Sequence, residues 1–183
     1  MSSDAKNIQQ LSLFTKSHAA EQSKSSTKSL SHTTWHLFID GAARQNPGPA
    51  GAGIYILKDG VPFYKDGYYL GKLTNNQAEY MALLIGLYFV EQWIQNEDAL
   101  HIFSDSQLLV RQLQGSYKVR NAGLLPKYNV ATQWLKTLHA SIQHITREEN
   151  YHADAMANQG IDLKKPIPPA FDARVRHHAP THL

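Results

Sequence analysis

The feature that most restricts the fold is a long segment that is apolar on nearly every side. From Met81 to Val90 the sequence MALLIGLYFV carries no charged side chain. The wider pattern from Gln77 to Gln95 is typical of a helix, and Thr74 with Gln77 three residues later gives a capping-box pattern at its start. A helix that is hydrophobic all round has to be buried. We therefore expect a layered fold with this helix packed between other elements.

Short apolar runs bounded by turn signals predict the remaining elements. Three runs near the start predict an antiparallel meander: WHLFIDGAA, GAGIYILKDG with a hairpin turn at Asp59-Gly60, and VPFYKDGYYLG. Later patterns predict a strand at Ala99–Ser104, helices at Ser106–Gln114 and Pro126–His139, a strand at Ser141–Thr146 and a helix at Glu149–Ile161. The order βββαβααβα indicates an α/β fold. It has a five-stranded mixed sheet, three antiparallel strands then two parallel ones, with helices on both faces.

The length of the chain and the composition of its segments predict one domain with two tails. The 183 residues are 42% hydrophobic, which suffices for one core. Residues 1–33 are polar and expected to be disordered, and 34–162 form the domain. Residues 163–183 are expected to be a basic, Pro-rich tail that partly packs through Phe171. There is no apolar run of about 18 residues and no signal-peptide pattern, so we expect a cytoplasmic protein without membrane contact. We also expect a monomer.

Composition restricts the possible chemistry more than the possible partners. The sequence has no cysteine, which excludes disulfides and thiolate metal sites and leaves carboxylates and ten histidines as possible ligands. The net charge is +3, yet residues 34–162 hold ten Lys and Arg against twelve Asp and Glu. The basic balance therefore comes from the tails and does not by itself indicate a polyanionic partner.

Four acidic residues stand in apolar surroundings on four separate elements. They are Asp40 in the first strand, Glu79 early in the long helix, Asp105 at the end of the fourth strand and Asp154 in the last helix. Buried carboxylates are rare unless they are paired or bound to a cation. Two Mg²⁺ ions roughly 4 Å apart would relieve their repulsion and suit a phosphoryl displacement. The alternative is that one or two of these acids are helix caps or surface charges.

The strings around these acids occur together in one order. They are FIDGAARQNPGPAGAG, LTNNQAEYMALLIGL, IFSDSQLLVRQL and REENYHADAMAN. Over residues 34–162 they resemble the type 1 ribonuclease H family. The resemblance implies a ribonuclease H-like fold, hydrolysis of the RNA strand of RNA–DNA hybrids to 5′-phosphate and 3′-hydroxyl ends, and two Mg²⁺ or Mn²⁺ ions per site. It also implies that Asp40, Glu79, Asp105 and Asp154 are the catalytic, metal-binding set.

The same resemblance implies contacts with the substrate. Positions that contact the minor groove and RNA 2′-hydroxyls match Asn46, Asn75, Asn76 and Gln107. Positions that hold a DNA-strand phosphate match Lys72 and Thr74. Amide groups can both donate to and accept from a 2′-hydroxyl, the group that distinguishes RNA from DNA. Simpler roles stay open, because Thr74 also fits a helix cap, Asn46 a turn residue and Lys72 a solvated charge.

Two stretches depart from the family pattern. Gln45 stands where the family usually has glycine before NPG, which reduces the backbone freedom of that loop. The loop before Asp154, which bears a histidine in some members, is shortened to TREEN. Glu148 or Glu149 either substitutes for that histidine or merely begins the helix favourably.

A separate motif lies in the N-terminal tail. Residues 10–14, QLSLF, form an isolated apolar cluster and resemble the short QLxLF peptide by which bacterial replication and repair enzymes bind the sliding clamp. The resemblance implies clamp binding by Gln10, Leu11, Leu13 and Phe14, with Leu13 and Phe14 as anchors and Gln10 as the hydrogen-bonding end. The alternatives are a chance match or packing on the protein's own core.

Two other classes of function are compatible with such a fold. One is a non-catalytic module that binds hybrids, and the presence of all four acids argues against it. The other is a related nuclease-fold enzyme that acts on DNA, and the strings TNNQAE and NPG argue against that class.

Overall fold

The computed structural model describes residues 32–180, so the QLSLF motif at 10–14 lies outside the described residues. The elements follow the predicted order, with one further helix at the end. They are β1 Thr34–Ala43, β2 Gly48–Lys58, β3 Val61–Leu73, α2 Asn75–Val90, β4 Ala99–Ser104, α3 Gln107–Leu113, α4 Leu125–Thr137, β5 Ser141–His144, α5 Tyr151–Leu163 and α6 Phe171–His177.

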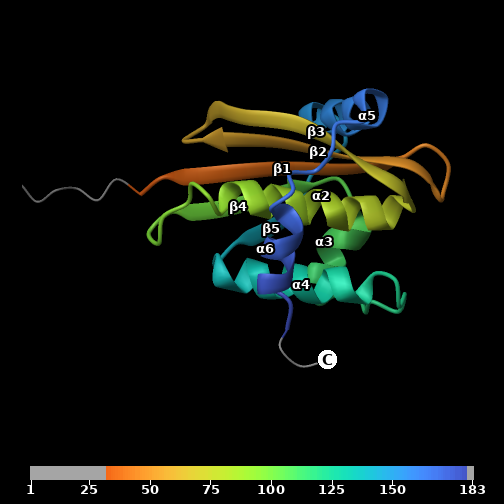
Figure 1. The fold of residues 1–183 in the computed structure, drawn as a ribbon. Helices are drawn as coiled ribbons and strands as arrows, with labels where there is room; N and C mark the ends of the chain where they lie inside the picture. Colours follow the sequence, from red (N-terminus) through yellow and green to blue (C-terminus); the bar gives the residue numbers. More distant parts are fainter. Residues whose placement is uncertain (1–31, 181–183) are drawn as a thin grey trace, which may run out of the picture. The chain divides into compact units, whose positions relative to one another are not determined.

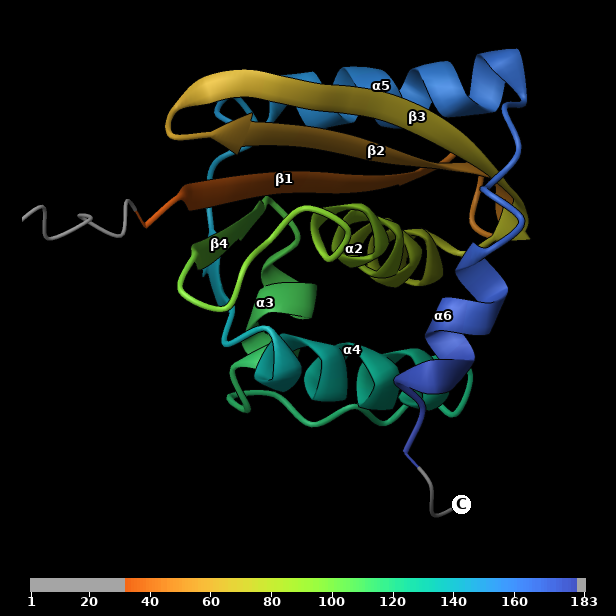
Figure 2. The same cartoon turned by 60° about the vertical axis from the view of Figure 1, so that its left-hand side comes forward.

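The five strands form one mixed sheet in the order β3-β2-β1-β4-β5. β1 pairs antiparallel with β2, and β2 with β3, whereas β1 with β4 and β4 with β5 are parallel pairs. α5 packs on one face of the sheet, and α2 covers the other face with α3 and α4 beyond it (Figures 1 and 2). This arrangement confirms the predicted fold class.

Strand β1 is the centre of the sheet and alternates between its two faces. Leu37 and Ile39 are fully buried against α2. His36 and Phe38 point to the opposite face and are only partly buried. Asp40 follows on that second face, because successive side chains of a strand alternate.

Helix α2 is buried on nearly all sides, as its composition predicts. Thr74 caps it: the Thr74 hydroxyl accepts from the Gln77 N–H at 3.3 Å, and the Gln77 side chain accepts from the Thr74 N–H at 3.0 Å. The helix ends at Val90, earlier than the predicted Gln95, because the next residues form tight turns onto its last carbonyls. No helix within residues 32–180 is long and apolar enough to cross a bilayer.

Helix α5 lies directly on the backbone of the sheet. A Cβ atom built on Gly53 of β2 would stand 1.9 Å from the carbonyl oxygen of Ala153, so only glycine allows this approach. Ala153 and Ala157 are fully buried at the contact, as their size predicts, whereas Ala155 faces solvent. The small residues on both elements fix the height of α5 above the sheet.

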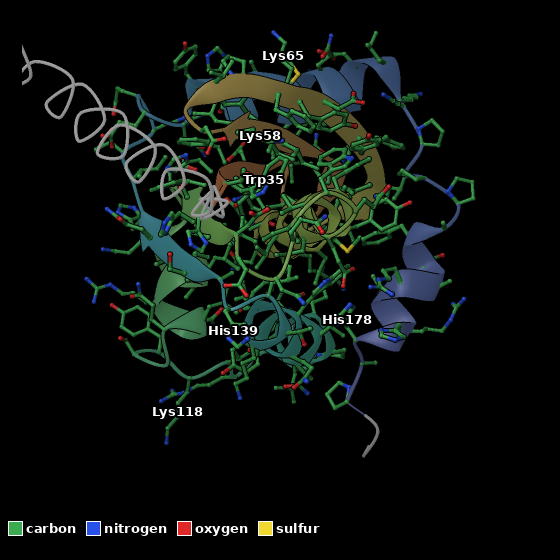
Figure 3. All side chains as sticks on the ribbon, turned by 90° about the vertical axis from the view of Figure 1, so that its left-hand side faces the viewer. Trp35, Lys58, Lys65, Lys118, His139 and His178 are labelled. Atoms are coloured by element: carbon green, nitrogen blue, oxygen red, sulfur yellow. The ribbon has the colours of Figure 1, made fainter. Side chains whose placement is uncertain are left out.

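The C-terminal segment contains a helix that the sequence did not predict. Phe171 is 3% exposed and its ring meets that of Tyr88 of α2 edge-on at 5.9 Å. Arg174 donates from Nε to Glu91 at 2.6 Å, and His178 lies where α6 meets α4, stacked on Trp134 (Figure 3). The expected packing of Phe171 is confirmed, and the helix was not predicted because a helix of only seven residues gives little periodic signal.

Position 45 gives a test of the loop between β1 and β2. Gln45 has a φ of 79°, in the left-handed region that costs a non-glycine residue about 1 kcal/mol. We expect Gln45→Gly to raise the melting temperature by about 2 to 4 °C. Gln133→Gly, at an exposed position inside α4, is the matched control and should lower it by a similar amount. A Gln45→Gly protein that melts at or below the wild-type temperature in calorimetry would contradict this account.

Candidate active site

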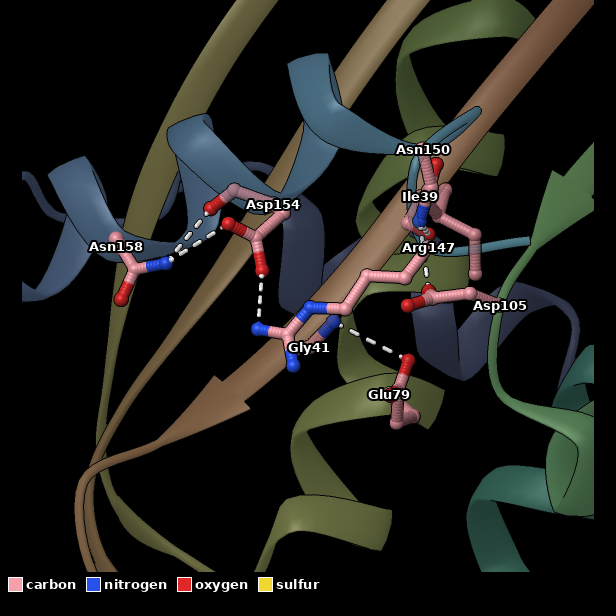
Figure 4. A network of polar contacts seen from close by, with 8 residues as sticks. All are labelled: Ile39, Gly41, Glu79, Asp105, Arg147, Asn150, Asp154 and Asn158. Carbon is pink, nitrogen blue, oxygen red and sulfur yellow. Dashed lines mark hydrogen bonds and ion pairs between the residues drawn. The ribbon is translucent and has the colours of Figure 1, made fainter. Parts of the chain in front are cut away.

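The four acids singled out in the sequence line one cleft. Asp40 comes from β1, Glu79 from α2, Asp105 from the residue after β4 and Asp154 from α5. Asn75, Arg147 and Asn158 line the same cleft. Figure 4 shows three of the acids, Glu79, Asp105 and Asp154, together with Arg147 and Asn158.

Asp40, on the central strand, is one of two buried carboxylates of the cleft that are difficult to ionise without a cation. Its side chain is 6% exposed. Burial, together with the charges of Asp105 and Asp154, raises the pKa of Asp40 to about 7. Arg147 and the N–H of Gly41 act in the opposite direction but do not compensate. Asp40 is therefore often protonated near neutral pH unless further positive charge arrives.

Glu79 reaches the cleft because α2 touches β1 at a glycine. A Cβ atom on Gly41 would lie 2.1 Å from the backbone nitrogen of Glu79, so the contact requires a glycine. The Gly41 N–H donates to Glu79 Oε2 at 3.1 Å (Figure 4). Burial, then the charges of Asp40 and Asp105, raises the pKa of Glu79 well above its usual value.

Asp105 is held by an asparagine that joins three elements. Asn150, buried just before α5, donates from Nδ2 to Asp105 Oδ1 at 2.8 Å and to the carbonyl of Ile39 at 2.9 Å (Figure 4). This one amide ties the end of β4 to β1 and to the start of α5. It fixes the Asp105 carboxylate toward the cleft.

Asp154 has two polar partners. Asn158, one turn later in α5, donates to Asp154 Oδ2 at 3.3 Å and to its carbonyl at 3.0 Å. Arg147 donates to Asp154 Oδ1 at 2.9 Å, and the Arg147 side chain is 75% exposed (Figure 4). The ion pair is thus an open one at the rim of the cleft, where solvent weakens it.

The donor set fits a hard divalent cation. All four groups offer carboxylate oxygens, which Mg²⁺ and Mn²⁺ prefer. Among the ion pairs of residues 32–180, only Arg147 brings a cation to these four acids. The raised pKa values of Asp40 and Glu79 show that this charge is insufficient. In the described part of the chain, no three His, Asp or Glu side chains already stand at the spacing of a metal site, so the fit rests on donor chemistry.

Of the expected substrate contacts, Asn75 is the one among the described residues that lines the cleft. Asn46 accepts at Oδ1 from the Asn75 N–H at 3.0 Å, which joins the loop after β1 to the start of α2. Lys72 and Asn76 are exposed on either side of Thr74, whose hydroxyl is occupied in capping α2. The remaining residue, Gln107, is exposed in the first turn of α3, two positions after Asp105.

Sequence reasoning assigned no role to Arg147, Asn150 or Asn158. All three lie in or near the string REENYHADAMAN, and the short loop with a cation ahead of Asp154 is the only signal that could have indicated Arg147. Glu149 accepts from the Thr146 N–H at 2.8 Å and closes the loop. Among the described residues that line the cleft, neither Glu148 nor Glu149 is found.

Comparison with known proteins agrees with this geometry. Residues 38–160 match the family described as reverse transcriptase-like. The ribonuclease HI of Halobacterium salinarum is 37% identical over 129 residues, which cover 69% of this chain and 64% of that protein. A bifunctional protein of Mycobacterium tuberculosis is 35% identical over 127 residues, which cover 67% of this chain and 34% of that protein. The chain therefore spans less than two thirds of the length of these relatives.

Solved structures of RNase H1 proteins are also similar to this chain. The crystal structure of RNase H1 from Halobacterium salinarum has a TM-score of 0.67 at 36% identity, covering 71% of this chain and 98% of that one. LC11-RNase H1, solved in complex with an RNA/DNA hybrid, has a TM-score of 0.66 at 34% identity, covering 70% of this chain and 97% of that one.

The pKa of Asp40 predicts how stability depends on pH when no divalent ion is present. Its folded value of about 7 lies above the ordinary 3.8, so the stability contributed by this group is complete at low pH and is lost as pH rises toward 7. Asp40→Asn removes the titration. The free energy of unfolding of this variant relative to wild type should grow by roughly 1 to 3 kcal/mol from about pH 5 to pH 8.

This pH dependence can be measured by urea unfolding in EDTA. Asp172→Asn, which changes an exposed carboxylate on α6, is the control, and its difference from wild type should stay constant over the same range. If the free energy of unfolding of Asp40→Asn minus that of wild type stays constant or shrinks with rising pH, ionisation of Asp40 does not destabilise the folded protein.

Proposed function

The chain belongs to the reverse transcriptase-like family, and on that premise we propose that it is a ribonuclease H, an endonuclease that hydrolyses the RNA strand of RNA–DNA hybrids. The products would carry 5′-phosphate and 3′-hydroxyl ends. The observation that carries the proposal is the convergence of four carboxylates from β1, α2, β4 and α5 in one cleft. All four come from one chain, so a monomer suffices for activity.

The carboxylates Asp40, Glu79, Asp105 and Asp154 would hold two Mg²⁺ or Mn²⁺ ions. When bound, such ions supply the positive charge that a phosphoryl displacement needs and lower the pKa of a bound water. The chain's own part is to present ionised oxygens at fixed positions. Asn150 orients Asp105, and Asn158 orients Asp154, through the hydrogen bonds described above.

Selection of the hybrid would come from the edge formed by the loop after β1 and the start of α2. Asn75 lines the cleft, and Asn46 and Asn76 stand beside it with exposed amide groups. Such amides can contact the RNA 2′-hydroxyl, which a DNA strand lacks. Lys72 is exposed at the end of β3 and would take a phosphate of the DNA strand.

Neutralising the central carboxylate tests the chemistry. We expect Asp40→Asn to fold and to lose at least about a hundredfold in hydrolysis of a labelled hybrid with Mg²⁺, because the amide holds the ions weakly. Asp172→Asn, with its exposed carboxylate far along the chain on α6, should cleave as wild type does. Full activity of Asp40→Asn would remove the basis of the assignment.

Shortening Asn75 tests the choice of substrate. Asn75→Ala should bring the cleavage rate of the hybrid closer to that of an RNA duplex or a DNA duplex, because one contact to the 2′-hydroxyl is lost. The control is Asn96→Ala, an exposed asparagine in the turn after α2. If the ratio of the cleavage rates for the hybrid and the other duplexes is the same as in wild type, the Asn75 side chain does not select the substrate, and the role of the residue is limited to the hydrogen bond of its N–H with Asn46.

For residues 10–14 we propose binding to a bacterial sliding clamp. The support is the sequence QLSLF itself, an apolar cluster among polar residues. Anchors such as Leu13 and Phe14 concentrate binding energy in few side chains. Roughly 20 residues lie between Phe14 and β1, and a linker of that length would span about 25 Å, enough to keep the nuclease near a clamp on DNA.

A peptide of residues 6–18 tests the clamp proposal directly. It should bind a purified bacterial sliding clamp in calorimetry with a Kd in the range of about 1 to 50 μM. In the full chain, Leu13→Ala with Phe14→Ala should abolish clamp binding and leave hydrolysis of free hybrid unchanged. A peptide with the same residues in scrambled order is the control, and equal binding of both peptides would exclude a specific motif.

A further inference from the structure

One face of the sheet is only partly covered by helices. α5 packs on β1, β2 and β3, and in the described part of the chain no helix packs on the same face of β4 and β5 (Figures 1 and 2). Ser141 and Gln143 of β5 are exposed there, in register with His101 and Phe103 of β4. This face is therefore open beside the first turn of α5.

Aromatic side chains occupy the open face. The strand register places Phe38 of β1 between Tyr55 of β2 and Phe103 of β4. His36 and His101 form the next pair on the same face. We call these five residues, with Tyr151 and His152 from the first turn of α5, the aromatic platform.

The rings of the aromatic platform form one continuous series of contacts. The Phe38 and Phe103 rings stack at 4.8 Å, and Phe103 stacks on His36 at 5.8 Å. Toward α5, Phe38 lies 5.8 Å from Tyr55, which lies 4.3 Å from His152. Tyr151 is 59% exposed, and each of the other rings is partly buried.

The aromatic platform is continuous with the candidate active site. Phe38 precedes Asp40 by two residues on β1, and Phe103 is the last residue but one of β4, after which Asp105 follows directly. Side chains two positions apart in a strand share a face, about 6 to 7 Å from each other. Tyr151 directly follows Asn150, the residue that holds Asp105. The aromatic platform therefore adjoins the carboxylates of the candidate active site.

The chemistry of this surface suits stacked bases better than an apolar protein partner. Only Phe38 and Phe103 are purely apolar, and the other rings carry a hydroxyl or imidazole nitrogens. Lys65 is exposed in the position that pairs with Tyr55, and Arg147 stands at the carboxylate end. Aromatic and His rings stack on unpaired bases, and cations at the margin attract the phosphates.

We propose that the aromatic platform binds single-stranded nucleic acid, namely the unpaired strand that continues from a hybrid lying in the cleft. This rests on the proposed function, because the hybrid is what delivers that strand to the carboxylate end of the platform. The enzyme would then favour hybrids that end in a single-stranded overhang over blunt ones.

Binding of short single strands tests the platform without any hydrolysis. The full chain, in EDTA, is titrated into fluorescein-labelled adenine-rich RNA or DNA of about eight nucleotides and followed by anisotropy. Phe38→Leu with Phe103→Leu keeps apolar volume and removes the stacking faces. We expect this variant to bind at least about fivefold more weakly than wild type. Tyr151→Leu changes an exposed ring on α5 and should weaken binding in the same direction.

The matched control is Phe63→Leu. Phe63 is also partly exposed, at 45%, but packs against Trp35, which lies on the α2 side of the sheet (Figure 3). Its variant should bind single strands as wild type does. No binding of either strand by wild type at about 50 μM, or equal binding by wild type and both platform variants, would overturn the proposal.

A second measurement separates this proposal from the proposed function. Hydrolysis of a blunt hybrid is compared with that of the same hybrid carrying an RNA or a DNA overhang. Wild type should show a lower KM for at least one overhang, and Phe38→Leu with Phe103→Leu should bring the ratio of KM values close to one. An equal KM for blunt and overhanging hybrids in wild type would overturn the platform alone. Failure of wild type to cleave even the blunt hybrid would overturn the proposed function, whatever the anisotropy shows.

Discussion

Four carboxylates in one partly buried cleft repel one another, and much of the structure serves to hold them there. Burial and mutual repulsion together raise the pKa of Asp40 to about 7 and that of Glu79 well above its usual value. A chain free to relax would separate such groups or leave them protonated. The guanidinium of Arg147 meets Asp154 in an exposed ion pair, so it offsets only part of the repulsion. A divalent cation is the simplest group that would neutralise the remaining negative charge.

The positions of the acids are fixed by backbone contacts that larger residues would prevent. α2 meets β1 at Gly41, and α5 meets β2 at Gly53, with less than 2.2 Å between the place of a Cβ atom and the opposing backbone. The apolar surface of α2, buried on nearly every side, supplies much of the free energy that keeps these elements together. Asn150 then ties β1, the end of β4 and the start of α5 to one another. The packing of the core thus holds the four carboxylates together against their mutual repulsion.

The sequence predicted the order of elements along the chain, the mixed sheet and the burial of α2, because period-two and period-3.6 patterns are strong in those segments. The capping box at Thr74 was also visible. Helix α6 was missed, since its seven residues depend on tertiary contacts such as that of Phe171. Asn150 was missed because its role arises from three chain segments meeting. The aromatic platform needed the strand register, which places Phe38 beside Phe103 although 64 residues separate them.

The most direct test of the account is a cleavage assay with the purified chain on three labelled duplexes of one sequence: an RNA–DNA hybrid, an RNA duplex and a DNA duplex. With Mg²⁺, we predict cuts in the RNA strand of the hybrid alone, with 5′-phosphate ends, and none when EDTA replaces Mg²⁺. Cleavage of the hybrid that persists in EDTA, or cleavage of the DNA duplex at an equal rate, would contradict it.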